Sequence, residues 1–205
     1  MRVVPLHRND PHDYSCVAYW VLGENNTPSD RNTLIDTGSA DAGNLAYFLK
    51  EMTHLSKGIG KQAVEQVILT HAHFDHTGGL PGIDRQFGPE TFAWLPSGRR
   101  PRPIRDGLSL RVGDQPGMLF HTPGHSEDSL CVYLPETGTL FSGDTLYRIT
   151  DHLGAYPKAY VATLERLAGL AVRTIYPGHG QPIFDDARGF IRSCLDNVHQ
   201  SLILE

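Results

Sequence analysis

Cysteine is scarce in this chain, which has Cys16, Cys131 and Cys194 among its 205 residues. An odd number of widely spaced cysteines excludes a fully paired disulfide framework of the kind that holds small secreted domains together. Each of the three lies among apolar residues, which is typical of a thiol that packs as a small hydrophobic side chain. We therefore predict three buried, free cysteines that take no part in disulfides or metal binding.

Long apolar runs are missing as well. No stretch approaches the roughly 20 residues that a helix needs to cross a bilayer. Residues 1–10 carry charged groups and have no apolar core of the kind found in signal peptides. The sequence therefore predicts a soluble, cytoplasmic protein with no membrane partner.

Basic residues are in the minority. The chain has 18 Lys and Arg against 23 Asp and Glu, a formal net charge of −5 at pH 7. Because proteins bind phosphate backbones mainly through Lys and Arg, this balance argues against a nucleic-acid partner. One local exception contains Arg99, Arg100, Arg102 and Arg105. It fits either a grip on a phosphate group or a solvated, proline-spaced loop.

Linkers, low-complexity tracts and internal repeats are also lacking along the chain. With 205 residues and 40% hydrophobic content, the chain can bury a single large core. We expect one domain over residues 1–205.

The most informative segment that is present is a cluster of three histidines and one aspartate directly after the apolar stretch 67–69. It reads Thr70-His71-Ala72-His73-Phe74-Asp75-His76. Because residues two apart in an extended chain point to the same side, His71 and His73 can face one ion. A turn at Phe74 would direct Asp75 and His76 toward a second. This spacing predicts a metal site.

Three further candidate ligands lie downstream, as they must if one short segment cannot complete a coordination shell. His125, Asp144 and His179 each follow a β-like run, at residues 117–121, 138–141 and 173–176. A glycine precedes each of them, which lets the backbone turn tightly near an ion. Upstream, Asp36 ends another apolar run just before Gly38, so it too lies between a predicted strand and a turn.

In this order the residues resemble the ligand pattern of the metallo-β-lactamase superfamily of metallohydrolases. The matching positions are Asp36, His71-x-His73-x-Asp75-His76, His125, Asp144 and His179. The resemblance implies an α/β fold, a four-layer αββα sandwich with the site at one edge. It also implies that one metal ion is held by His71, His73 and His125. The second would be held by Asp75, His76 and His179, with Asp144 bridging the pair and Asp36 supporting the site from behind.

The chemistry expected of such a site is hydrolysis. Two divalent ions about 3.5–4 Å apart share a water, lower its pKa toward neutrality and present a bridging hydroxide to a carbonyl or phosphoryl centre. Asp144 has two oxygens and can bind both ions, while Asp75 can bind one ion and relay the proton of the water. A His-rich shell with carboxylates favours zinc, and iron or manganese would also be accommodated.

Two residues between Asp144 and the next predicted helix are further candidates. Tyr147 could stabilise the developing oxyanion of the substrate, or it could simply pack under the site; both interpretations stay open. His152 could contact substrate. The other histidines are interpreted as structural or surface residues, because a solitary histidine is more often one of these than a ligand. They are His7, His12, His54, His121 and His199.

The choice among branches of the superfamily depends on a few positions. True β-lactamases have Cys or Ser where Asp144 stands, and flavodiiron proteins have Glu where His73 stands, so both activities are disfavoured. The string Phe141-Ser142-Gly143-Asp144-Thr145-Leu146-Tyr147 looks most like glyoxalase II and acyl-coenzyme A thioesterases. The chain stops soon after His179 without the helical domain by which glyoxalase II binds glutathione.

The resemblance therefore implies a small-molecule thioester or related ester as substrate. The alternatives are a lactonase, a ribonuclease or a phosphodiesterase on the same fold, and a metal-binding module without catalysis.

The coarse order of elements fits this fold. We expect strands at residues 15–22, 31–36 and 64–69, a helix at 45–55, a short helix after Gly79, and strands throughout 91–142. A helix at 157–170 begins at a proline, as helices often do. A last strand at 173–176 and a closing helix at 185–204 complete the chain. Two groups of strands, each flanked by helices, suit two packed sheets with helices outside.

Overall fold

The first of two large sheets contains the strands of the N-terminal half. The computed structural model describes residues 1–8, 10, 12–55, 61–94 and 102–204. The sheet has the order β1-β2-β3-β4-β5-β6, in which β1 to β3 pair antiparallel and β3 to β6 pair parallel. Its strands are β1 (Arg2–Leu6), β2 (Ala18–Leu22), β3 (Thr33–Ile35), β4 (Gln66–Ile68), β5 (Glu90–Ala93) and β6 (Arg102–Pro103). Because β3 and β4 are parallel, the segments that follow them leave at the same edge.

The second sheet contains the strands of the C-terminal half, in the order β12-β10-β9-β8-β7. Its strands are β7 (Leu108–Val112), β8 (Gln115–His121), β9 (Leu130–Leu134), β10 (Thr139–Gly143) and β12 (Thr174–Pro177). β7 to β10 form an antiparallel meander, and β12 lies parallel to β10. The parallel pair carries the chain after both strands to one edge, just as β3 and β4 do in the first sheet.

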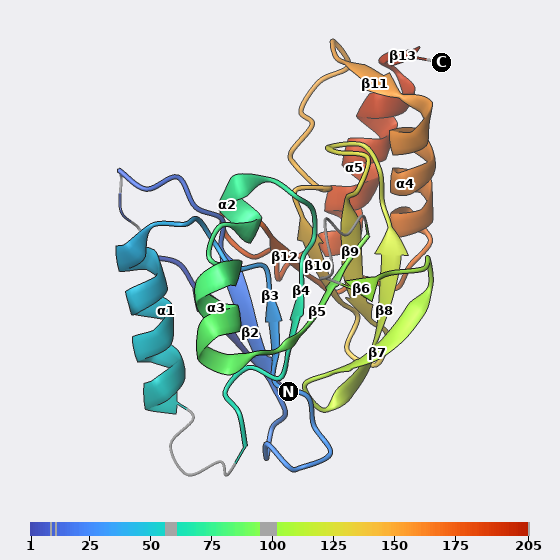
Figure 1. Ribbon diagram of the computed structural model, residues 1–205. Coiled ribbons are helices and arrows are strands. Elements are labelled where there is room, and N and C mark those ends of the chain that lie inside the picture. Colours follow the sequence, from blue (N-terminus) through green and yellow to red (C-terminus); the bar gives the residue numbers. More distant parts are fainter. Residues whose placement is uncertain (9, 11, 56–60, 95–101, 205) are drawn as a thin grey trace.

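Helices cover the outer face of each sheet (Figure 1). α1 (Ala42–Leu55) and α3 (Leu80–Phe87) pack on the first sheet in one apolar cluster, through side chains such as Phe48 and Ile83. α4 (Lys158–Ala168) and α5 (Ala187–His199) pack on the second sheet in another, through Leu164 and Ile191. A third cluster, with Phe141 among its members, fills the space between the two sheets. The four-layer αββα sandwich is confirmed.

Several strands are covered on both faces, by the other sheet on one side and by a helix on the other. β2, β9 and β10 are buried at every position. Each has one row of side chains toward the other sheet and one row toward a helix, so an alternating pattern would place polar groups in a core. The three cysteines are buried and free, as predicted from their apolar neighbours.

The structure differs from the expected elements at three places. β1 was not predicted, and the turn expected at Phe74 is a short helix, α2 (Phe74–Thr77). The closing helix ends at His199, and the last strand, β13 (Leu202–Leu204), pairs with β11 (Ala155–Pro157). This pairing, begun by a hydrogen bond from Leu202 N–H to the carbonyl of Gly154, outweighs the local tendency to continue the helix.

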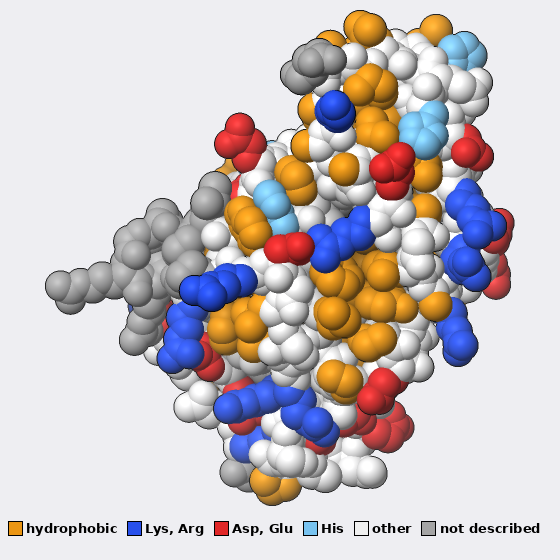
Figure 2. All heavy atoms as spheres, turned by 90° about the vertical axis from the view of Figure 1, so that its right-hand side faces the viewer, with side chains coloured by type: hydrophobic (Ala, Val, Ile, Leu, Met, Phe, Trp, Pro, Cys, Tyr) orange, Lys and Arg blue, Asp and Glu red, His pale blue; other side chains and the backbone are white. Residues whose placement is uncertain are grey.

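The β11–β13 ribbon lies at one end of the molecule and exposes apolar side chains. Leu153, Leu202 and Leu204 are exposed. Figure 2 shows hydrophobic side chains at this end and a broader group of them near the middle of the same face, with charged side chains around both. Among the described residues, no helix combines the length and the apolar character that crossing a bilayer requires.

Candidate metal centre

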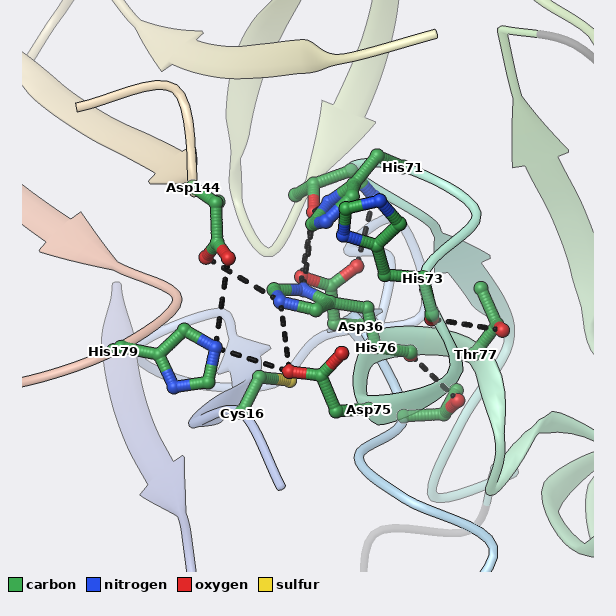
Figure 3. Close-up of polar contacts among 12 residues, drawn as sticks. Cys16, Asp36, His71, His73, Asp75, His76, Thr77, Asp144 and His179 are labelled. Carbon is green, nitrogen blue, oxygen red and sulfur yellow. Dashed lines mark hydrogen bonds and ion pairs between the residues drawn. The ribbon is translucent and has the colours of Figure 1, made fainter. Parts of the chain in front are cut away.

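The candidate ligands come together where the two sheets meet, on segments that leave the C-terminal ends of strands (Figure 3). β4 leads to His71 and His73, and α2 then carries Asp75 and His76. From the second sheet, β8, β10 and β12 lead to His125, Asp144 and His179, respectively. The parallel strand pairs described above are what bring these segments to a common edge.

One group of potential ligand atoms contains His71, His73 and His125, whose ring nitrogens lie within 4.8 Å of one another. Nε2 of His125 is 3.0 Å from Nδ1 of His73. His71 is buried, while His73 and His125 are exposed. This is the set of side chains that the resemblance to metallohydrolases implied for one metal ion.

A second group contains Asp75, His76 and His179, again with ligand atoms within 4.8 Å of one another. Nε2 of His179 is 3.0 Å from Oδ2 of Asp75, and Nε2 of His76 is 3.6 Å from the same oxygen. Asp75 and His76 are buried because α2 packs them beneath the surface. These are the side chains that the resemblance implied for the second ion.

Asp144 lies between the two groups. Its Oδ1 is 3.3 Å from Nε2 of His76, and its Oδ2 is 3.6 Å from Nε2 of His125 and 3.5 Å from Nε2 of His179. A single carboxylate thus reaches members of both groups, which is the geometry required of a bridging ligand.

The donor set fits divalent cations. Nε2 of His71 is buried and has no hydrogen-bond partner among the described residues. Nε2 of His76 and Oδ1 of Asp144 are also buried, and they lie 3.3 Å apart as an ion pair without a well-formed hydrogen bond. The same three side chains have ligand atoms within 4.8 Å of one another. Burying polar atoms without full hydrogen bonding is costly, and a cation bound between these three atoms would be coordinated by all of them. Nitrogen and carboxylate donors without sulfur suit Zn²⁺, Fe or Mn²⁺.

Asp36 holds this arrangement from behind. Its Oδ1 accepts a hydrogen bond from the backbone N–H of Thr70 at 2.7 Å, and its Oδ2 accepts one from the Thr70 hydroxyl at 2.8 Å. Oδ2 also lies 2.8 Å from Nδ1 of His76. With Nδ1 engaged by the carboxylate, Nε2 of His76 is directed toward the centre. Asp36 has φ 59, a left-handed conformation that is uncommon for a residue other than glycine and that Asp tolerates better than most.

Burial and charge shift the pKa values of the three central groups in different directions. Burial lowers the pKa of His71 to about 3, so this ring is neutral at pH 7. Burial would also lower the pKa of His76, but the charge of Asp36 and the ion pair with Asp144 outweigh it and raise the pKa. Burial would raise the pKa of Asp144, but the ion pair with His76 lowers it to about 2.

Three residues near the centre were not recognised from the sequence. Thr70 lies inside the His-rich motif, but its bonds to Asp36 depend on the pairing of β3 with β4. Cys16 was correctly predicted to be buried, yet it also lies beside Asp36 and His76, where burial raises its pKa to about 12. The ring of Tyr14 stacks on that of His179 at 5.4 Å and 27°. No local sequence signal marks Cys16 or Tyr14, because both contacts join segments far apart in the chain.

The remaining predicted candidates lie around the centre. Tyr147 lines a cavity beside it and also stacks on Tyr160, with ring centroids 5.9 Å apart and planes 4° apart. His152 is exposed, and it is neither in a potential ligand group nor on the cavity wall among the described residues. Arg99 and Arg100 lie outside the described residues, and Arg102 forms an ion pair with Glu90.

The cavity has a volume of about 930 Å³ and opens directly onto the centre. His125, Asp144 and His179 form its polar end. Its other walls come from the segments that follow Asp144 and His179 and from α5. The side chains there include Leu146, Tyr147, Arg148, Ile183, Phe184 and Phe190.

Comparison with known proteins agrees with this geometry. The sequence profile of the metallo-beta-lactamase superfamily matches residues 13–179. An atrochrysone carboxyl ACP thioesterase from Aspergillus fumigatus is 30% identical over 188 residues, which cover 84% of this chain and 42% of that protein. The chain spans between 38% and 42% of the length of three curated relatives, of which two are named atrochrysone carboxyl ACP thioesterases and one a lactamase-like protein.

Two solved structures are similar over almost the whole chain. A metallo-beta-lactamase family protein from Thermus thermophilus superposes with a TM-score of 0.73 at 24% identity, covering 97% of this chain and 79% of that one. The structure of TTHA1623 in a di-iron-bound form gives a TM-score of 0.64 at 26% identity, covering 93% and 96%. The first similarity supports the fold alone, and the second is to a protein that holds two iron ions.

Proposed function

This chain belongs to the metallo-β-lactamase superfamily, and from that premise we propose that it is a metal-dependent hydrolase of small-molecule thioesters. The observation that carries the proposal is the convergence of seven potential ligands, three of which direct buried polar atoms without well-formed hydrogen bonds toward one another. A catalytic role for a cation is supported by the cavity that opens onto the same atoms. A metal held only for structure would be enclosed by its ligands.

The side chains divide into two ligand sets with one shared member. His71, His73 and His125 would hold one divalent cation, Asp75, His76 and His179 the other, and Asp144 would contact both. Two cations held by these residues would lower the pKa of a water between them and would polarise the carbonyl of a substrate. The di-iron form of a structural relative supports a pair of ions, and zinc, iron or manganese would suit the donors.

Asp75 is the residue we assign to proton transfer. Its Oδ2 contacts His76 and His179, so Oδ1 is the atom that accepts a proton from the attacking water and passes it to the leaving thiolate. α2 buries this carboxylate, which keeps it close to the reacting atoms and away from bulk solvent. Exchange of the carboxylate for an amide removes the proton acceptor and keeps a potential oxygen ligand.

Tyr147 is the residue we assign to the substrate carbonyl. It lies on the cavity wall three positions after Asp144, and its ring is held by Tyr160. Burial raises the pKa of its hydroxyl, so the group is protonated at neutral pH and can donate a hydrogen bond to the oxyanion that develops.

A thioester is favoured over other substrates by two observations. A curated relative that this chain covers in part is named as a thioesterase that acts on an acyl carrier protein substrate. A cavity that is mainly apolar suits an acyl group, whereas a phosphodiester would need cationic walls. The net charge of −5 agrees with this choice.

A substrate panel on metal-loaded protein tests the proposal. We expect metal-dependent turnover of S-lactoylglutathione, acyl-coenzyme A esters or N-acetylcysteamine thioesters, which a chelator abolishes. Asp75→Asn should lower kcat by about 10²- to 10⁴-fold with the metal content retained. Asp151→Asn, at an exposed position away from the ligand groups, serves as the matched control and should leave kcat unchanged.

Two results of the same assays would contradict the proposal. Turnover confined to an acyl-homoserine lactone or to RNA would replace thioesters with those substrates. Tight metal uptake without turnover of any substrate would indicate a metal-binding module.

A further inference from the structure

The cavity beside the centre has an aromatic wall that thioester hydrolysis as such does not require. Tyr147, Phe184 and Phe190 line it, together with Leu146 and Ile183. The side chain of Phe184 is 62% exposed and that of Tyr147 is 45% exposed, although large apolar side chains are usually buried. Large apolar side chains left accessible in one concave place mark a binding surface more often than a random feature of the fold.

These rings are held in fixed positions. Tyr147 stacks on Tyr160, whose hydroxyl donates to the carbonyl of Thr145 at 2.9 Å. Phe184 contacts the ring of Tyr176 edge to face, with centroids 6.0 Å apart and planes at 88°. The guanidinium of Arg148 lies 5.8 Å from the centre of the Phe190 ring. A wall with little freedom to lose binds a rigid group at low entropic cost.

The same two segments that carry ligands also carry the rings. Tyr147 and Arg148 follow Asp144 in the loop between β10 and β11, and Phe184 follows His179 in the loop between β12 and α5. A carbonyl placed between Asp144 and His179 therefore has its substituent directed along these rings. The polar end and the aromatic wall form one continuous site.

Size adds a second constraint. A volume of about 930 Å³ lies near the upper end of the range of about 300–1,000 Å³ that is usual for small-molecule sites. An acetyl or lactoyl group would fill a small part of it and leave the rings in contact with water. A fused pair of aromatic rings would cover them.

We propose that this cavity binds the acyl part of the substrate and selects flat aromatic acyl groups over short aliphatic ones. The inference rests on the proposed thioesterase function for its kinetic test, but not for its binding test. Tyr147 and Phe184 provide the ring faces that make the selection, and Asp144 and His179 provide the polar end.

The kinetic test compares three N-acetylcysteamine thioesters that differ in the acyl group, namely acetyl, hexanoyl and 2-naphthylacetyl. Their carbonyls are similar in reactivity, and each rate is divided by the rate of hydrolysis by hydroxide alone. We expect kcat/KM to be at least about tenfold higher for 2-naphthylacetyl than for acetyl, and higher than for hexanoyl. Phe184→Ala should lower the 2-naphthylacetyl value about tenfold, mainly through KM, and leave the acetyl value within twofold.

The control and the binding test separate this inference from the proposed function. Leu202→Ala removes an apolar side chain that is 64% exposed and lies outside the cavity, so it should change none of these values. Calorimetry with 2-naphthylacetate, the carboxylate without its thiol part, should show binding. Phe184→Ala should weaken this binding about tenfold, and Leu202→Ala should not.

Each outcome decides one of the two. Equal kcat/KM for acetyl and 2-naphthylacetyl, or an equal effect of Phe184→Ala on both, would overturn the acyl selection and leave the thioesterase intact. Absence of turnover on every thioester would overturn the thioesterase. In that case, binding of 2-naphthylacetate that depends on Phe184 would still support the cavity as an aromatic site, and its absence would remove that too.

Discussion

The centre has two unlike halves. The inner group, which consists of Asp36, Thr70, His71 and His76, is buried and belongs to the segments that follow β3 and β4. The outer group, which consists of His73, His125 and His179, is exposed. Thr70 and His76 are joined to the carboxylate of Asp36 by short hydrogen bonds, and Nδ1 of His71 lies 3.1 Å from the Thr70 hydroxyl. Of the outer rings, His73 and His125 contact each other, and His179 contacts Asp75 and stacks on Tyr14.

The difference shows how stability and access are divided between the halves. Asp36 satisfies Thr70 and Nδ1 of His76 within the protein, so these parts of the inner group can be rigid before any cation arrives, while the Nε2 atoms of His71 and His76 stay available to it. Exposed rings can be hydrated, so the outer group costs little to leave open and gives cations and substrate a way in. Asp144, half-buried between them, joins the two.

The largest expected effect comes from breaking the inner group. Asp36→Ala leaves the N–H and hydroxyl of Thr70 and Nδ1 of His76 without their buried acceptor, so we expect a loss of about 3–5 kcal/mol in the free energy of unfolding. His179→Ala, in the outer group, should cost less than about 1 kcal/mol in metal-free protein. Urea denaturation of both variants measures the contrast.

Asp36→Asn is the matched variant for this comparison, since Asn also tolerates a positive φ. It keeps one acceptor for Thr70 and should lose less stability than Asp36→Ala. If His179→Ala proved as destabilising as Asp36→Ala, the two halves would not differ in the way described.

A second, smaller difference should appear in the pH dependence of metal binding. The raised pKa of His76 means that this ring carries a proton at pH 7 in metal-free protein, whereas His71, with a pKa of about 3, carries none. A cation at Nε2 of His76 must displace that proton, so its affinity should rise with pH, by about tenfold per pH unit for one proton. A cation at His71 displaces no proton from that ring.

Titration calorimetry in two buffers of different ionisation enthalpy counts the protons released at each binding step. We expect about one proton more from the step that involves His76. His76→Asn should abolish that excess. Equal proton release at both steps in the unmodified protein would show that His76 is already neutral and that the assigned direction of its pKa shift is wrong.

The smallest expected effect concerns how the outer group is positioned. Tyr14 stacks on His179, so Tyr14→Ala should weaken the cation held by Asp75, His76 and His179 by about 3- to 10-fold, the worth of one aromatic contact. The cation held by His71, His73 and His125 should bind within twofold of its original affinity. Competition with a chromophoric chelator measures both affinities.

Tyr14→Phe keeps the ring and should restore the affinity, which separates stacking from any role of the hydroxyl. Tyr47→Ala, on α1 and away from the centre, is the control and should change neither affinity. An equal loss at both cations would indicate a general disturbance of the N-terminal segment instead of a contact with His179.

Much of the candidate site could be predicted because its ligands lie in recognisable local sequence patterns. His71, His73, Asp75 and His76 lie within six residues, and the geometry of extended chain limits where such neighbours can point. A glycine and a β-like run mark each distant candidate. Tyr14 and Cys16 carry no such mark, since each meets the centre through a fold-level contact between segments.

The sequence by itself determined the kinds of donor, their spacing within one segment and the two groups of strands, because covalent geometry and hydrophobic patterning act over a few residues. Tertiary structure alone decided which half of the centre is buried and that an aromatic cavity adjoins Asp144. It also decided that Asp36 contacts both Thr70 and His76. These depend on how two sheets pack and on which strand ends meet at their common edge, and no local rule specifies that packing.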